Sequence, residues 1–122
     1  MLKDGKGFSK VIIKCGRTDL RRGITGLCSI IRLEFGMDPL EDGTLFLFCG
    51  NRRDTIKGVM YEGGDGFILI TKKLSNGKYL WPRNRDEARL LSKEEFSRLM
   101  NGFAVESSIK VYRPVGPGQA EQ

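Results

Sequence analysis

Residues 43–78 read GTLFLFCGNRRDTIKGVMYEGGDGFILITKKLSNGK and contain three β-forming runs separated by charged turns. The turn at 50–54 carries two arginines, the turn at 62–66 is acidic, and the turn at 72–78 carries three lysines. Alternate turns of an antiparallel meander lie at the same end of a sheet. We therefore predict that the arginine and lysine turns lie together, opposite the acidic turn, and form a basic edge of phosphate size.

The flanking sequence predicts further strands. The β-branched run at 10–15 is followed by Gly16 and predicts a first strand. Residues 78–81 follow a tight-turn signal and precede Pro82, which predicts a fourth meander strand. A last strand is predicted at 108–112.

Two amphipathic helices are also predicted. The first begins at Thr18 or Asp19, ends at Gly36, and carries apolar residues at helical spacing, namely Leu20, Ile24, Leu27, Ile30 and Ile31. Gly23 and Gly26 would allow another element to approach this helix closely. The second begins at the capping box Ser92-Lys93-Glu94-Glu95 and ends at Gly102.

These elements predict a single α+β domain over residues 1–113, followed by a flexible C-terminal tail at 114–122 that is rich in Pro and Gly. The expected sheet is antiparallel and strongly bent or barrel-like, with a meander of about four strands plus one or two more. Two helices pack against it. The length of 122 residues fits one domain.

Composition restricts the functional classes. No apolar run approaches the ~18 residues of a membrane span, and the N-terminus lacks the apolar core of a signal peptide, so we expect a cytoplasmic protein. The three cysteines are far apart, and the chain contains no histidine. Ser-His and Cys-His catalysis within this chain is therefore excluded.

Charge points to an anionic partner. The net charge is +6, and the excess of Lys and Arg lies in residues 1–32 and 72–122, whereas residues 33–71 are acidic. Such segregation favours a polyanion such as double-stranded DNA, although basic charge also serves solubility alone. The first candidates for phosphate contact lie in the two basic turns: Arg52, Arg53, Lys72 and Lys73.

A second group of candidates lies on the polar face of the first predicted helix. Arg21, Thr25, Ser29 and Arg32 share one side of a helix, and Arg22 is adjacent. This face is either a solvated surface or a row of phosphate contacts made by Arg21, Arg22 and Arg32.

The only tryptophan, Trp81, precedes a cluster of arginines and is either a core residue or a base-stacking residue. Alternate strand ends of a meander lie at the same end of the sheet. Arg83 and Arg85, which follow the fourth predicted strand, are therefore expected near the acidic turn.

A magnesium-dependent nuclease is the enzymatic alternative. Its carboxylates would be Asp19, Asp54 and Asp65, but each has a structural explanation as a helix cap, an arginine partner or a turn residue. The meander separates Asp54 from Asp65 by the length of a strand pair. We therefore expect no catalytic residues, no metal site and no cofactor.

A series of short motifs in register resembles a known family, the TnpB accessory proteins of the insertion sequence 66 family of bacterial transposable elements. The motifs span about residues 10–104: Gly16 to Gly23 with Gly26-Leu27, Asp38-Pro39, Gly43 to Phe48, Asn51 to Asp54 with Ile56-Lys57, Gly64 to Phe67, Lys72 with Leu74, and Trp81-Pro82. Arg17 replaces a common proline, and the acidic turn has one extra residue.

The resemblance implies a non-catalytic accessory role in DNA transposition. It implies two protein partners encoded by the same element, the transposase and a companion accessory protein. Contacts to element DNA, to the transposase or to both are compatible with this role. The alternative is a protein adaptor without DNA contact, whose basic edge meets an acidic surface of the transposase.

Overall fold

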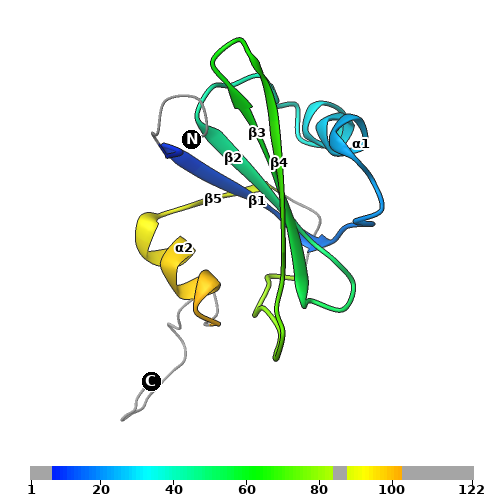
Figure 1. Cartoon of the computed structure of the whole chain (residues 1–122), viewed down its shortest axis with the longest axis vertical. Helices are drawn as coiled ribbons and strands as arrows, with labels where there is room; N and C mark the ends of the chain where they lie inside the picture. Colours follow the sequence, from blue (N-terminus) through cyan, green and yellow to red (C-terminus); the bar gives the residue numbers. More distant parts are fainter. Residues whose placement is uncertain (1–6, 84–87, 103–122) are drawn as a thin grey trace.

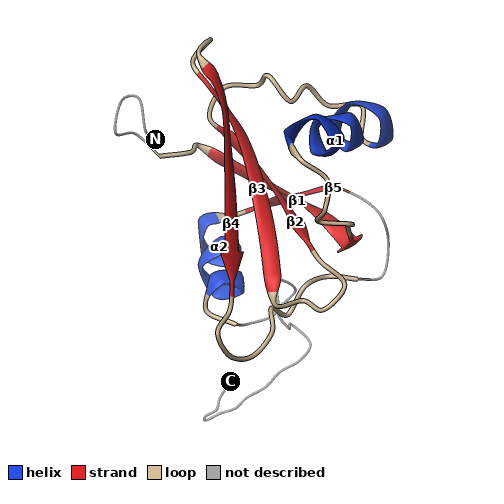
Figure 2. Ribbon diagram, turned by 45° about the vertical axis from the view of Figure 1, so that its right-hand side comes forward, coloured by secondary structure: helices blue, strands red, loops and turns tan. Residues whose placement is uncertain are grey.

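The computed structural model describes residues 7–83 and 88–102 as a five-stranded open sheet with a helix on each face (Figures 1 and 2). The elements, in chain order, are β1 (Lys10–Arg17), α1 (Ile24–Ser29), a π-helical segment (Ile30–Glu34), β2 (Thr44–Cys49), β3 (Thr55–Glu62), β4 (Gly66–Lys73), β5 (Ala88–Leu91) and α2 (Lys93–Met100). The α+β class with two helices is confirmed. The predicted strand at 108–112 and the tail at 114–122 lie outside the described residues.

Strands β2, β3 and β4 form the predicted antiparallel meander. The arginine and lysine turns meet at one end, where Leu74 N–H donates to the Asp54 carbonyl and Tyr79 N–H donates to the Arg53 carbonyl, each at 2.7 Å. The acidic turn closes the other end, where Glu62 pairs with Gly66. The predicted polarity of the sheet is confirmed.

The sheet is mixed, not wholly antiparallel, and its strand order is β4-β3-β2-β1-β5. Strand β1 pairs with β2 in parallel. The reason is the connection: the helical segment between them carries the chain back to the end where β1 began, as parallel pairing requires. Strand β5 adds antiparallel to the outer side of β1.

Residues 78–81 do not form the predicted fourth meander strand. After Leu74 the chain leaves β4, turns at Gly77 with φ +84°, and continues to β1. The Pro82 carbonyl there accepts a hydrogen bond from Gly16 N–H, and Trp81 Nε1–H donates to the Lys14 carbonyl at 2.8 Å. Tertiary contacts to β1 thus replace a strand ladder.

The first helix starts later than predicted. Gly23 is its N-cap, and the helical segment ends before Gly36, which has φ +62°. Asp19 instead stabilises a turn by accepting a hydrogen bond from Arg21 N–H at 3.0 Å. The three atoms nearest to a Cβ on Gly26 would all belong to the Arg22 side chain, so the closest neighbour of this glycine is its own segment. The capping box at Ser92 is confirmed.

Each face of the sheet carries its own apolar core. Helix α1 and the π-helical segment cover one face, where Leu27, Ile31, Phe46, Phe48 and Val59 are buried. The other face, beneath α2, buries residues that include Ile13, Leu47, Ile56, Tyr79, Trp81 and Leu99. The odd-numbered residues of β3 and β4 therefore face α1, and the even-numbered residues face α2. No described helix is long and apolar enough to span a membrane.

The Tyr79→Phe variant should be at least as stable as the wild type. The Tyr79 hydroxyl is buried and has no hydrogen-bond partner among the described residues. An unpaired buried polar atom costs roughly 1–3 kcal/mol, so removing it should raise the free energy of unfolding or leave it unchanged. Urea denaturation followed by circular dichroism measures this. A loss above about 1 kcal/mol would mean that the hydroxyl has a stabilising partner.

Candidate functional site

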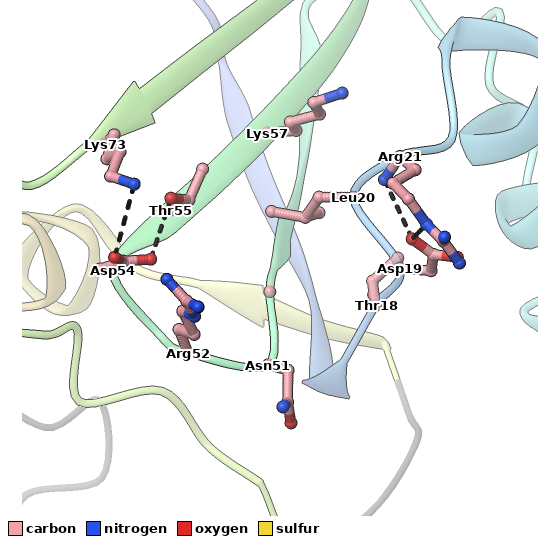
Figure 3. Close-up of a pocket in the computed structure, with 11 residues that line it drawn as sticks. Thr18, Asp19, Leu20, Arg21, Asn51, Arg52, Asp54, Thr55, Lys57 and Lys73 are labelled. Atoms are coloured by element: carbon pink, nitrogen blue, oxygen red, sulfur yellow. Dashed lines mark hydrogen bonds and ion pairs between the residues drawn. The ribbon is translucent and has the colours of Figure 1, made fainter.

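An open pocket of about 700 Å³ lies at the basic end of the sheet (Figure 3). We call it the basic pocket. It lies between the segment that follows β1, the β2–β3 turn, and the adjoining ends of β3 and β4. Its lining consists of Thr18, Asp19, Leu20, Arg21, Gly50, Asn51, Arg52, Asp54, Thr55, Lys57 and Lys73.

Backbone hydrogen bonds hold the walls of the basic pocket in place. Thr18 N–H donates to the Cys49 carbonyl at 2.8 Å, which fixes the segment after β1 against the end of β2. Gly50 N–H donates to the Thr55 carbonyl at 3.1 Å and closes the β2–β3 turn. A Cβ on Gly50 would lie 3.0 Å from Leu20 Cδ1, so the glycine lets Leu20 pack closely on this turn. The pocket is therefore built on fixed backbone.

The side chains of the basic pocket include four cations and two carboxylates, which leaves an excess of two positive charges. Asp19 binds Arg21 through a hydrogen bond from Nη2 of 2.8 Å. Asp54 accepts a hydrogen bond from Thr55 and lies 3.9 Å from Lys73 Nζ (Figure 3).

Two cations of the basic pocket have no carboxylate partner within residues 7–83 and 88–102. Lys57 donates to the Arg22 carbonyl at 3.4 Å. The exposed Arg52 side chain has no hydrogen bond or ion pair among the described residues. It projects between Asp54 and Asn51 (Figure 3). Arg52 and Lys57 are thus available to an external anion.

The Asp19 carboxyl should titrate near pH 2. Hydrogen bonds from the Arg21 guanidinium, and then from the Arg21 backbone amide, lower its pKa from 3.8 to about 2. The stabilisation from this pairing is therefore present above pH 3.8 and is lost as the pH falls through 2. Carboxyl chemical shifts followed by NMR over pH 1–6 measure the midpoint.

Two variants separate the causes of this low pKa. Arg21→Ala should return the Asp19 midpoint towards 3.8, because the hydrogen bonds from the guanidinium are lost while the one from the backbone amide remains. Arg22→Ala removes a neighbouring charge and no hydrogen bond to Asp19, so the midpoint should remain near 2. A wild-type midpoint close to 3.8 would show that Arg21 does not hold Asp19.

Thr18 provides a further polar group on the wall of the basic pocket. Its side chain is only 6% exposed, and its Oγ1 has no hydrogen-bond partner among the described residues. Buried hydroxyl groups are normally paired with protein or water.

A smaller cavity of about 110 Å³ adjoins the basic pocket across Gly50 and Asn51. The charged side chains that line it are Arg17, Arg53 and Arg83. Arg17 Nη1 donates to Asn51 Oδ1 at 3.3 Å. The prediction that Arg83 lies near the acidic turn is therefore wrong, because residues 78–83 cross to β1 at the basic end. Arg85 lies outside the described residues.

The structure divides the predicted contact residues into three groups. Arg21, Arg52 and Lys73 line the basic pocket, and Arg53 lines the smaller cavity. Lys72 pairs with the buried Ile56 and lies on the α2 face, opposite Lys73. Arg22 and Arg32 are exposed and line neither cavity.

The predicted helical row of cations does not form, because Arg21 precedes α1. Sequence reasoning also missed Lys57, Thr18 and Asn51 as lining residues. The alternation along β3 carried a signal for Lys57, since this residue shares a face with Thr55.

The groups required for the enzymatic alternative are separated. Asp54 and Asp65 lie at opposite ends of the β3–β4 pair, and Asp19 is held by Arg21. Within residues 7–83 and 88–102, no three His, Cys, Asp or Glu side chains gather closely enough to hold a metal ion. Cys49 borders the smaller cavity, but burial raises the pKa of its thiol to about 12, which leaves it protonated at neutral pH.

The fold and the basic pocket define a small α+β domain with an open cationic surface at one end of its sheet. The family model of IS66 Orf2-like proteins matches residues 9–110, and the chain belongs to this family. Its members are accessory proteins associated with transposition.

Two relatives from Sinorhizobium fredii (strain NBRC 101917 / NGR234) are similar to the chain. The uncharacterized protein y4hO is 32% identical over 97% of this chain and 100% of its own length. The uncharacterized protein y4jC is 34% identical over 84% of this chain and 86% of its own length. No solved structure matches the chain significantly.

Proposed function

We propose that the protein assists transposition by binding the phosphate backbone of element DNA at the basic pocket, without carrying out strand chemistry itself. The observation that supports this proposal is Arg52, a cation without a partner among the described residues, beside Lys57 and Lys73 in an open pocket. Arginine and lysine are the usual side chains for phosphate contact, and such contacts fix position without reading sequence.

The shape of the site favours a backbone over a small ligand. The basic pocket is open, and a row of cations continues past the β2–β3 turn to Arg53, Arg17 and Arg83. A duplex carries one negative charge per about 1.7 Å of helix axis, so an extended row of cations can contact several phosphates at once. The expected role is to position DNA for the transposase.

Fluorescence anisotropy of the purified protein with labelled duplexes tests this proposal. One duplex carries the terminal repeat of the element and the other a scrambled sequence, each over a salt series. We expect binding to both at low salt, with log K falling by about 0.9 per neutralised phosphate as log salt rises. No binding at low salt would reject DNA as the partner and leave an acidic surface of the transposase as the ligand of the basic pocket.

The non-catalytic role has its own test. Incubation of the protein with end-containing duplex and Mg²⁺ should produce no strand cleavage. Cleavage that is lost in Asp19→Asn or Asp54→Asn would establish an enzyme instead.

A further inference from the structure

Among the described residues, strand β4 forms a long outer edge of the sheet. Strand β4 is the first in the strand order, and no described residue pairs with its outer side. All eight of its residues pair with β3, without a bulge or a proline. The other edge strand, β5, has only four residues. Natural proteins normally block a long edge strand, because its unpaired backbone groups attract another strand.

Two backbone hydrogen bonds determine which groups of β4 point outward. Leu74 N–H donates to the Asp54 carbonyl, which makes these two residues a hydrogen-bonded pair at the end of the ladder. Alternate pairs of an antiparallel ladder exchange hydrogen bonds, so the even-numbered residues of β4 bond to β3. The hydrogen bond from Gly50 N–H to the Thr55 carbonyl agrees with this assignment, because it shows that Thr55 directs its backbone towards β2 and not towards β4. Phe67, Leu69, Thr71 and Lys73 therefore direct their backbone N–H and C=O groups outward.

We propose that β4 pairs in antiparallel orientation with β4 of a second copy of this chain, about a two-fold axis at Ile70. In this register Phe67 is opposite Lys73 and Leu69 is opposite Thr71. Every outward N–H and C=O of these four residues then finds a partner. A symmetric pairing of this kind closes on itself and needs no other protein.

The side chains of β4 fit this register. Leu69 and Ile70 are each 38% exposed, and the pairing covers both. Ile70, which packs over Gly58, would meet its symmetry mate across the axis on the α2 face. Lysine does not face lysine, because Lys72 is opposite Ile68 and Lys73 is opposite Phe67. Lys73 instead lies diagonally across from Asp65 of the partner subunit, within reach of a long side chain.

The dimer has a consequence for the site, which rests on the proposed function. A two-fold axis perpendicular to the sheet keeps each face on the same side in both copies. Both basic pockets would therefore lie on one face of a continuous sheet, where one duplex could contact both.

Sedimentation velocity of the full chain without DNA, combined with a disulfide trap, tests the dimer independently of DNA binding. Ile70→Cys places two thiols at a non-hydrogen-bonded pair, where the Cα atoms are about 4.5 Å apart and a disulfide can form. We expect a covalent dimer on mild oxidation. The native cysteines Cys15, Cys28 and Cys49 are buried and should not interfere. Leu80→Cys, at a residue that is 47% exposed and outside β4, is the matched control and should remain monomeric under denaturing conditions.

A second pair of variants tests the outward backbone. Thr71→Pro removes a donor that points away from β3, so the fold should survive while the dimer dissociation constant rises at least tenfold. Thr71→Ala keeps the donor and should leave the constant within about threefold. A chain that is monomeric at all concentrations without crosslinking through Ile70→Cys would overturn the proposal. A dimer that Ile70→Cys does not crosslink and whose dissociation constant Thr71→Pro does not change would overturn it as well.

Discussion

Trp81→Ala is expected to lower the free energy of unfolding by about 3–5 kcal/mol, as large-to-small changes of buried aromatic residues do. Trp81 is 5% exposed and lies in the core beneath α2. Its Nε1–H also donates to the carbonyl of Lys14, next to the position where the β1–β2 register shifts. The variant therefore loses both apolar packing and the bond that attaches residues 78–83 to β1.

Urea denaturation followed by circular dichroism is the suitable measurement, because Trp81 is the only tryptophan and its fluorescence is lost in the variant. Leu80→Ala is the matched control, since Leu80 is the exposed neighbour in the same segment. Its stability should change by less than about 1 kcal/mol. Equal stabilities for the two variants would show that Trp81 does not anchor this segment.

The double variant Arg52→Ala/Lys73→Ala should weaken duplex binding by roughly tenfold to a hundredfold at low salt. Both cations line the basic pocket, and each is expected to displace about one counterion from DNA. The slope of log K against log salt should therefore decrease in magnitude by about 1.8. Fluorescence anisotropy over a salt series measures both quantities.

The control for overall charge is Lys72→Ala/Lys93→Ala, which also removes two exposed cations. Lys72 lies on the α2 face, and Lys93 lies in the first turn of α2. The control should bind duplex within about threefold of the wild type. If both double variants lose affinity equally, net charge rather than the basic pocket accounts for binding.

The end of the sheet at which each turn lies could be predicted from the sequence, because it depends only on the order of strands and turns along the chain. The alternation of β-forming runs with the arginine, acidic and lysine turns was enough to place the two basic turns together and the acidic turn opposite. The structure confirms this through the bond between Asp54 and Leu74 and the pairing of Glu62 with Gly66. The capping box at Ser92 could likewise be predicted, since both of its hydrogen bonds join Ser92 and Glu95, which are three positions apart. Such local patterns do not depend on the rest of the fold.

The predictions that were wrong concern parts of the fold that depend on long-range contacts. The sequence of residues 78–81 suits a strand, but the indole of Trp81 and the Pro82 carbonyl find partners on β1, more than sixty positions away. The parallel pairing of β1 with β2 likewise follows from the path of the crossover.

The candidate site could be predicted only in part. The adjacent lysines of β4 are predicted to act together, yet Lys72 and Lys73 point to opposite faces, because successive side chains of a strand alternate. The pairing of β4 with β3 determines that Lys73 is the one on the face of the basic pocket. The sequence supplied the basic end of the sheet. The division of its cations between the two faces required the register.

The most direct test of the central claim, that the basic pocket binds DNA, is an NMR titration of ¹⁵N-labelled protein with a short duplex at low salt. We predict that amide shifts concentrate at residues 18–21 and 50–57 and at Lys73, and that they reverse on addition of salt. Shifts concentrated on α2 and the α2 face of β4, or no shifts at a concentration where anisotropy reports binding, would contradict the account.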